Sequence, residues 1–267
     1  MKGSKIVRQA VQGKWSLVTG ASAGIGVALA EDLAAAGANL VLTARRLDRL
    51  ESLAARLQSE YRIEVRTIAA DLADPAVPQQ LFAATEGAGL AIDVLVNNAG
   101  FGYEGAFIKS DPDSQRKMVD VNCAAVVHLT GLFLPKMVER RRGYVMILAS
   151  TAAYQPVGYM STYAATKVFD RFLAEALAHE VAEYGIKVSA LCPGPTESEF
   201  LIVAGGREQR GRGKQSAEEV ARLGLEGLIQ GKSWVIPYNA GKVMVFMQRF
   251  APRKLVSGAA AKMFRPR

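Results

Sequence analysis

Residues 15–26 read WSLVTGASAGIG, and the fold of the whole chain is best approached from this stretch. Its first five residues form a mainly apolar run that predicts a short buried strand, and the helical pattern after it ends near Gly37. Between the two, Gly20 permits a sharp turn, while Gly24 and Gly26 let backbone approach an anion at the helix N-terminus. A strand, a glycine turn and a helix in this order predict a pyrophosphate site, and the alternative is an ordinary tight turn.

Strand and helix patterns alternate along the rest of the chain. Further strands are predicted at residues 39–44, 64–69, 93–96, 144–149 and 233–237, and a helix at 77–88. This alternation predicts an α/β fold, a doubly wound domain with a largely parallel, about seven-stranded sheet flanked by helices. Ligands bind such sheets beyond the carboxyl ends of the strands. We therefore expect the glycine turn, Arg45, Asp71, residues 97–100 and Ser150 to meet at one edge.

Composition predicts one domain over residues 1–267, with residues 1–13 as an N-terminal extension. Half of the residues are hydrophobic and 22% are charged, which allows a sizeable core. No secretory pattern and no apolar run near the roughly 20 residues of a bilayer span is predicted. Cys123 and Cys192 are predicted as buried free thiols, and no metal site is predicted. These features favour a cytoplasmic protein.

The net charge of +8 is concentrated at the C-terminus. From Gly227 onward there is no Asp or Glu, and the eight Lys and Arg residues of this segment account for the whole net charge. No nucleic-acid motif accompanies it. Residues 250–267 are predicted as a basic tail. The basic C-terminal segment either lies on an anionic membrane or completes the fold or a subunit interface. As far as Pro237 the second interpretation is favoured, because residues 233–237 are predicted as a strand. Beyond Phe250 both interpretations stay open.

Two arginines follow the second predicted strand. An NAD site places an acidic residue there for the ribose hydroxyl, but this chain has Arg45 and Arg46, and no acid before Asp48. Arginine instead forms charge-assisted bonds with a 2′-phosphate, which predicts NADP(H) as cofactor; a solvated turn is the alternative. Asp71, just past the third strand, is positioned to accept from an adenine amino group.

Tyr163 and Lys167 lie four residues apart in a long predicted helix, so they share a face. The apolar stripe of that helix includes Phe169 and Phe172, and we expect it on the other face. A phenol has a pKa of about 10, which a nearby ammonium lowers, so the pair predicts acid–base chemistry. Ser150, at the end of a strand, is placed to hold a substrate oxygen. Taken alone, the pair also fits two solvated side chains.

Together these residues resemble the short-chain dehydrogenase/reductases over about residues 14–200. The resemblance rests on Thr19-Gly20-x-x-x-Gly24-x-Gly26, Asp71, Asn97-Asn98-Ala99-Gly100, Asn122, Ser150, Tyr163-x-x-x-Lys167 and Pro193-Gly194, in the order and spacing of that family. Residues 192–200 are also similar to a bacterial branch of uncharacterised reductases. The resemblance implies a Rossmann-type fold and reversible reduction of a carbonyl to an alcohol with NADP(H).

The resemblance also implies residue roles. Tyr163 would donate the proton, Ser150 would orient the carbonyl, Lys167 would lower the tyrosine pKa and hold the nicotinamide ribose, and Asn122 would support a proton-relaying water. The implied cofactor contacts are Gly20, Ser22, Ala23, Gly24, Ile25, Gly26, Arg45, Arg46, Asp71, Leu72, Asn98, Ala99, Gly100, Tyr163, Lys167, Pro193, Gly194, Thr196 and Ser198. A homodimer or homotetramer is expected by analogy.

Substrate preference is less determined by the sequence. Residues 198–217 form a candidate lid whose four basic residues either meet a phosphate-bearing acyl carrier or are solvated, and the solvated loop is favoured. Candidate pocket residues are Phe101, Tyr103, Tyr154, Pro156, Val157 and Tyr159. Their apolar character predicts a hydrophobic ketone or 3-oxoacyl substrate. The alternatives are a catalytically silent NADPH-binding regulator and a membrane-surface lipid reductase.

Overall fold

A computed structural model of the chain describes residues 4–197, 199–200, 204–205 and 215–265. Its centre is a seven-stranded parallel sheet with the order β3-β2-β1-β4-β5-β6-β7. The strands are β1 (Trp15–Thr19), β2 (Asn39–Ala44), β3 (Val65–Ala69), β4 (Ile92–Asn97), β5 (Gly143–Leu148), β6 (Ile186–Leu191) and β7 (Trp234–Val235). The predicted α/β fold class is confirmed. The strand order reverses between β1 and β4, which is where doubly wound sheets bind ligands.

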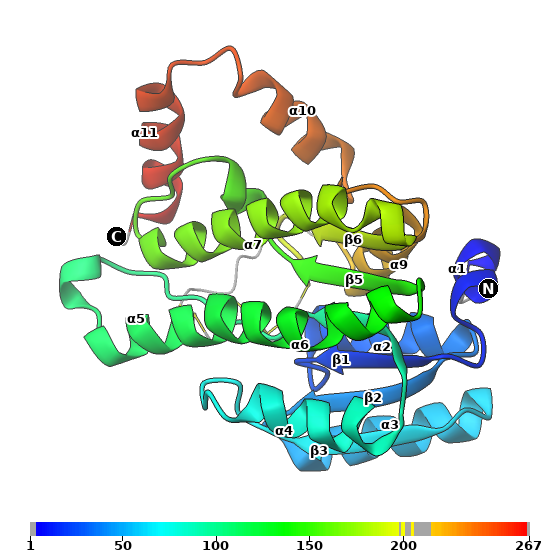
Figure 1. Ribbon diagram of the computed structural model, residues 1–267. Helices are drawn as coiled ribbons and strands as arrows, with labels where there is room; N and C mark the ends of the chain where they lie inside the picture. The colour runs from blue at the N-terminus through cyan, green and yellow to red at the C-terminus, as the bar shows by residue number, and fades with distance from the viewer. Residues whose placement is uncertain (1–3, 198, 201–203, 206–214, 266–267) are drawn as a thin grey trace.

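Helices cover both faces of the sheet (Figure 1). On one face lie α2 (Gly24–Ala35), α3 (Leu47–Tyr61) and α9 (Ala217–Ile229), and on the other α4 (Val77–Ala84), α5 (Pro112–Val119), α6 (Ala125–Glu139) and α7 (Ser161–Glu180). Short helical segments connect them: η1 (Glu86–Ala88), η2 (Phe107–Lys109), η3 (Asp120–Ala124), η4 (Thr151–Tyr154) and η5 (Ala182–Tyr184). The helix expected at 77–88 is therefore divided at Thr85, whose φ of −120° and ψ of −92° are not helical.

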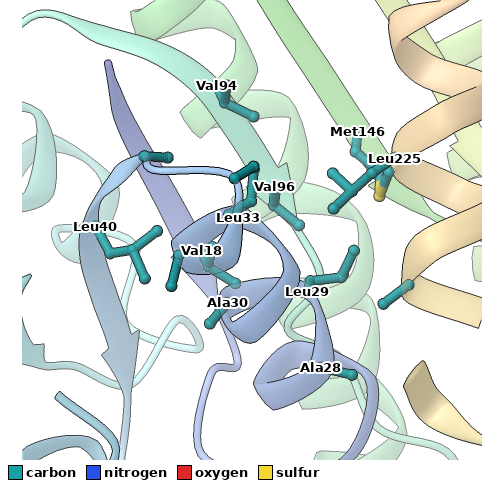
Figure 2. Packing of buried hydrophobic residues seen from close by; sticks show 14 of the residues in the cluster. Val18, Ala28, Leu29, Ala30, Leu33, Leu40, Val94, Val96, Met146 and Leu225 are labelled. Carbon is teal, nitrogen blue, oxygen red and sulfur yellow. The ribbon is translucent and has the colours of Figure 1, made fainter. Parts of the chain in front are cut away.

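Burial of apolar side chains between sheet and helices holds this arrangement. Figure 2 shows Leu29 and Leu33 of α2 packed among strand residues such as Val18 and Val96, and all four are fully buried. Full burial of each such side chain stabilises the fold by about 1.5–3 kcal/mol. Because both faces of the sheet are covered, the central strands are continuous apolar runs and lack a polar face.

One helical run passes a simple test for a membrane span. Pro112–Glu139, which joins α5, η3 and α6, is long and apolar enough by length and composition. Half of its most apolar window is buried inside the domain, as in the core helix of a globular protein. Its composition follows from this packing, so it is weak support for a membrane span.

Two terminal segments differ from the predicted extensions. The N-terminal residues include the helix α1 (Lys5–Val11), which buries Val7 and Val11 in the core beside α2 and α9. The C-terminal segment forms two helices, α10 (Asn239–Met247) and α11 (Arg253–Phe264). Figure 1 shows these two helices projecting from the β7 end of the sheet over the α7 side. We call residues 239–264 the C-terminal hairpin.

The predicted orientation of the Tyr163–Lys167 helix was wrong. The inward face of α7 carries Ala164, Lys167, Asp170 and Ala174, whereas Phe172 and Phe169 of the predicted apolar stripe are exposed. The sequence pattern predicted that the more hydrophobic face packs inward. The inward face instead contains Lys167 and Asp170, whose opposite charges pair with each other.

Candidate active site

The glycine turn is locked to the loop that follows β4. The Thr19 hydroxyl accepts hydrogen bonds from the backbone N–H groups of Asn98 (3.0 Å) and Ala99 (2.9 Å), and the Asn98 side chain donates to the Thr19 carbonyl at 2.8 Å. Gly20 and Gly24 have φ angles of +66° and +54°, which favour glycine. Helix α2 begins at Gly24 without a side-chain cap, so its first N–H groups remain available to an anion.

Gly26 has a different role from the one predicted. A Cβ at this position would lie 2.3 Å from the Gly20 carbonyl oxygen and 2.5 Å from the Asn98 side chain. Residue 26 therefore must be glycine so that α2 can pack against the turn. It does not belong to the cavity lining, unlike Gly20 and Gly24.

The two arginines after β2 lie beside the glycine turn. Arg46 donates to the Ser22 hydroxyl (3.1 Å from Nη2) and pairs with Glu199 at 3.0 Å, while Arg45 lines the cavity. Asp71 is already engaged, because one carboxylate oxygen accepts from the Ala73 N–H and the other pairs with Lys117 at 3.0 Å. Lys117 was not predicted as a site residue, since nothing in the sequence near α5 indicated that it reaches β3. The adenine role of Asp71 stays a prediction.

Ser150 and Tyr163 meet beyond the end of β5. The Ser150 hydroxyl oxygen accepts from the Ala152 N–H at 3.1 Å, and the same hydroxyl interacts with the Tyr163 phenol. Tyr163 comes from the first turn of α7 and packs its ring against Phe200, with 5.0 Å between centroids. The Lys167 Nζ lies 5.8 Å from the Tyr163 ring centroid. The structure thus brings the three residues of the predicted acid–base group together.

Lys167 has a buried carboxylate partner that the sequence analysis missed. Its Nζ donates to the Leu148 carbonyl (2.7 Å) and to Asp170 (2.9 Å), and both charged side chains are almost fully buried. The other oxygen of Asp170 has no hydrogen-bond partner within the described part of the chain. The signal was present in the sequence, because Asp170 follows Lys167 by three residues on the same helix.

This carboxylate changes the electrostatics of the pair. Burial raises the pKa of Tyr163 above its ordinary value, the Lys167 ammonium and the Ser150 hydroxyl lower it, and Asp170 raises it again. Burial lowers the pKa of Lys167, but Asp170 and Tyr163 together raise it. Lys167 lowers the pKa of Tyr163 as expected, but burial and Asp170 outweigh it, so the net pKa lies above the ordinary value of a phenol. A neutral phenol suits proton donation in the reductive direction.

Asn122 lies in η3, a π-helical segment between α5 and α6. Its side chain accepts from the Phe101 N–H (3.1 Å) and donates to the Phe101 carbonyl (3.0 Å) and the Thr166 hydroxyl (3.0 Å). Such segments recur at functional sites. The side chain therefore ties the loop after β4 to α7, and the implied relay through a water stays a prediction.

One cavity of about 1030 Å³ runs from the glycine turn to Tyr163. The predicted site residues that line it are Gly20, Ser22, Ala23, Gly24, Ile25, Arg45, Arg46, Asp71, Leu72, Asn98, Ala99, Gly100, Ser150, Tyr163, Lys167, Pro193, Gly194 and Thr196. Gly26 and Asn122 lie outside this lining. Ser198 and the basic residues of the candidate lid fall outside the described residues.

The substrate end of the cavity differs from the predicted pocket. Of the candidate pocket residues, Phe101 and Val157 line it, whereas Tyr103, Tyr154, Pro156 and Tyr159 do not. Tyr154 instead lies under the Arg171 guanidinium, 4.2 Å from ring centroid to Cζ. Most of the apolar wall comes from the C-terminal hairpin, with Met244, Met247, Leu255, Val256, Ala259, Ala260, Met263 and Phe264. Sequence reasoning missed this wall because the hairpin is remote in sequence.

Residues 14–228 match the profile of the short chain dehydrogenase family. The chain belongs to this family. The resemblance inferred from the motifs is therefore confirmed, and the family match ends before the C-terminal hairpin begins at Asn239.

Individual relatives add detail to this family assignment. The chain is 36% identical over 185 residues to the very-long-chain 3-oxoacyl-CoA reductase of Homo sapiens, covering 68% of this chain and 59% of that protein. It therefore spans about three fifths of the length of this relative. A solved short-chain dehydrogenase from Sphingobium yanoikuyae in complex with NADPH superposes with a TM-score of 0.81 at 30% identity, covering 89% and 93% of the two chains.

A second solved relative has a bulky substrate. The bulky-bulky ketone specific alcohol dehydrogenase from Comamonas testosteroni matches with a TM-score of 0.76 and 29% identity, covering 89% of this chain and 92% of that one. Both solved structures therefore share the fold of this chain over 89% of its length.

Proposed function

We propose that this short-chain dehydrogenase transfers a hydride between NADP(H) and a hydrophobic ketone or 3-oxoacyl substrate. The observation that carries the proposal is the single cavity that has Arg45 and Arg46 at one end and Tyr163 below an apolar wall at the other. Such a cavity suits a phosphorylated dinucleotide lying in line with an apolar carbonyl compound. The NADPH complex of the Sphingobium relative supports the cofactor, and the names of the human and Comamonas relatives support the substrate class.

The residues at the dinucleotide end fit NADP(H). The uncapped N-terminus of α2 and the positive φ angles of Gly20 and Gly24 provide an anion cradle that a Cβ would disturb. Arg46 is already oriented by Ser22, and Arg45 stands directly after β2, where an NAD site would place an acidic residue. Glu199, which pairs with Arg46 at 3.0 Å, would have to release the guanidinium to a bound 2′-phosphate. The nicotinamide would supply or accept the hydride.

The chain's own residues would handle the proton and the carbonyl. The Ser150 hydroxyl donates to the carbonyl oxygen while its own oxygen is held by Ala152 N–H. Tyr163 keeps a proton on Oη at neutral pH because of its raised pKa, and it gives this proton to the same oxygen in reduction. Lys167, fixed by Leu148 and Asp170, stabilises the phenolate that remains. Placing an ammonium near developing negative charge lowers the barrier.

Turnover and binding assays test this proposal. NADPH oxidation is followed with a panel of ketones and 3-oxoacyl thioesters of increasing chain length, and NADPH and NADH binding are measured by calorimetry. We expect turnover that rises with chain length and tighter binding of NADPH than of NADH. NADPH binding without turnover on any panel member would favour the catalytically silent regulator, and absence of nucleotide binding would refute the proposal.

Compartment and assembly are also proposals. A reducing cytoplasm suits the two free cysteines, whose thiol pKa values burial raises to about 12. A homodimer would bury the exposed outer faces of α6 and α7, with Val127, Phe169 and Phe172. Light scattering of the wild type and of Phe172→Glu tests this, since a charge in an apolar interface should leave a monomer.

A further inference from the structure

The C-terminal hairpin exposes apolar side chains to solvent in addition to those that line the cavity. Helix α11 has no buried residue and α10 buries only Gly241. Val243, Phe246 and Met247 of α10 are exposed and follow one another at helical spacing. Phe250, three residues beyond the end of α10, continues this row and is 72% exposed. Phe246 and Phe250 contact each other, with 5.4 Å between ring centroids. Adjacent exposed apolar side chains of this kind indicate an interaction surface.

Every charged side chain of this surface is positive. The described residues 239–265 carry six exposed cations and no acid: Lys242, Arg249, Arg253, Lys254, Lys262 and Arg265. Two copies of the hairpin facing each other across a twofold axis would bring these like charges together, which disfavours a dimer through this surface. Apolar side chains among lysines and arginines, without acids, are typical of helices that lie in an anionic lipid interface.

The hairpin is attached at its two ends and covers the cavity between them. At its start, Gly194 and Gly241 leave just enough room for the Tyr238 ring, since a Cβ at either would lie about 2.5 Å from it. At its end, Phe264 packs against Val157 and Met160, near the catalytic serine. Between these ends, Val245 packs against the domain core and Ala261 lies close to Gly158, while many other side chains of the hairpin are exposed.

Some exposed apolar side chains of the hairpin also line the cavity. Leu255 and Met263 line the cavity and are 67% and 74% exposed. None of the hairpin residues that line the cavity is charged, so a hydrophobic molecule that enters along the hairpin would meet a mainly apolar wall on the way to Tyr163.

We propose that the C-terminal hairpin binds the surface of an anionic bilayer, so that the cavity takes its hydrophobic substrate directly from the lipid phase. The evidence for the binding surface is the set of exposed apolar residues together with the exclusively positive charge of the hairpin. The second part, substrate entry, rests on the proposed function.

Vesicle flotation tests the binding surface with the full chain. The probes are vesicles of phosphatidylcholine alone and of phosphatidylcholine with phosphatidylserine. The hairpin variant is Arg249→Glu, Arg253→Glu and Lys254→Glu together. The matched control is Lys5→Glu, Lys109→Glu and Lys232→Glu, which lowers the net charge equally at exposed positions elsewhere.

We expect the wild type and the control to float with the phosphatidylserine vesicles and not with phosphatidylcholine alone. Each cation near the surface contributes about 1 kcal/mol, so the hairpin variant should bind on the order of 100-fold more weakly. Added salt should weaken wild-type binding. Equal loss in both triple variants, or no flotation of the wild type, would overturn the proposal. Phe246→Ser with Phe250→Ser should also reduce flotation, and a change in oligomeric state without vesicle binding would assign the surface to a second copy.

Flotation requires no turnover, so its outcome is independent of the proposed reaction. Substrate entry is tested by measuring NADPH oxidation with a long-chain ketone supplied in the vesicles and with a short soluble ketone. The hairpin charge variant should lose rate only with the vesicle-borne substrate. Equal rates for variant and wild type on that substrate would refute entry from the lipid, even if flotation succeeds.

Discussion

The cavity joins two regions that are built in opposite ways. The Tyr163 cluster, which comprises Asn122, Ser150, Tyr163, Lys167 and Asp170, lies where β4, β5 and α7 meet and is held by buried hydrogen bonds at 2.7–3.1 Å. The C-terminal hairpin shapes the substrate end of the same cavity with almost no buried residue of its own. The difference indicates that the position of the reacting groups is fixed by the sheet, while the shape of the entrance is not.

The largest expected effect comes from removing Tyr163, the proposed proton donor. Tyr163→Phe should lower kcat/KM by about 10²–10⁴-fold, the range of general acid catalysis, while NADPH still binds. Steady-state kinetics with the best panel substrate measure it. The control is Tyr159→Phe, a nearby tyrosine that does not line the cavity. Comparable losses in both variants would contradict a special role for Tyr163.

Cofactor selection should depend on the arginines at the other end of the cavity. Replacing Arg45 and Arg46 by alanine removes charge-assisted hydrogen bonds worth about 1.5–3 kcal/mol each, so the KM for NADPH should rise at least about tenfold. The KM for NADH should hardly change. Arg49→Ala is the control, because Arg49 also pairs with Glu199, at 2.8 Å, but does not line the cavity. An unchanged ratio of the two KM values would contradict NADP(H) selection by this pair.

Two glycine substitutions compare the packing of the two regions. Gly26→Ala places a Cβ against the Gly20 carbonyl and should lower the free energy of unfolding by about 1–3 kcal/mol. Gly258→Ala, in α11, meets nothing within 4 Å and should raise it by up to about 1 kcal/mol through helix propensity. Urea unfolding measures both. Destabilisation by Gly258→Ala would show that α11 packs closely against the rest of the protein at this position.

Asp170 gives a prediction about pH. Its carboxylate raises the pKa of Tyr163, so Asp170→Asn should lower that pKa. Alcohol oxidation needs the phenolate, and its rate should therefore begin to rise at lower pH in the variant. Carbonyl reduction needs the phenol, so its loss on the alkaline side should also begin at lower pH. The pH profiles of kcat/KM measure both, and Glu175→Gln on the same helix is the control. A shift in the opposite direction would contradict this electrostatic role.

The smallest effect is expected at the entrance of the cavity. Leu255→Ala removes part of an exposed apolar wall, so the KM for a long-chain ketone should rise about tenfold or less. Kinetics with a short ketone should be unchanged, which makes the short ketone an internal control. Equal effects on both ketones would indicate that the hairpin acts on the Tyr163 cluster and not on the entrance.

The sequence predicted the sheet better than it predicted side-chain partners. Strands β1 and β2 begin and end where the sequence pattern placed them, because buried parallel strands are continuous apolar runs bounded by turns. Lys117 was missed because its contact with Asp71 depends on how α5 packs and not on local pattern. Asp170 lies three residues after Lys167 on α7, but its burial depends on which face of that helix packs inward. The orientation of α7 was wrong for a related reason. A buried ion pair looks like a polar face in sequence, and a solvent-exposed Phe172 looks like a core residue.

The family match ends at residue 228, and the C-terminal hairpin begins at Asn239. The part of the chain that shapes the entrance of the cavity thus lies beyond the residues matched by the family profile, and β7 joins it to the domain that holds the Tyr163 cluster. For protein engineering, the same arrangement makes residues 239–264 the natural segment to replace when a different chain length or a water-soluble substrate is wanted.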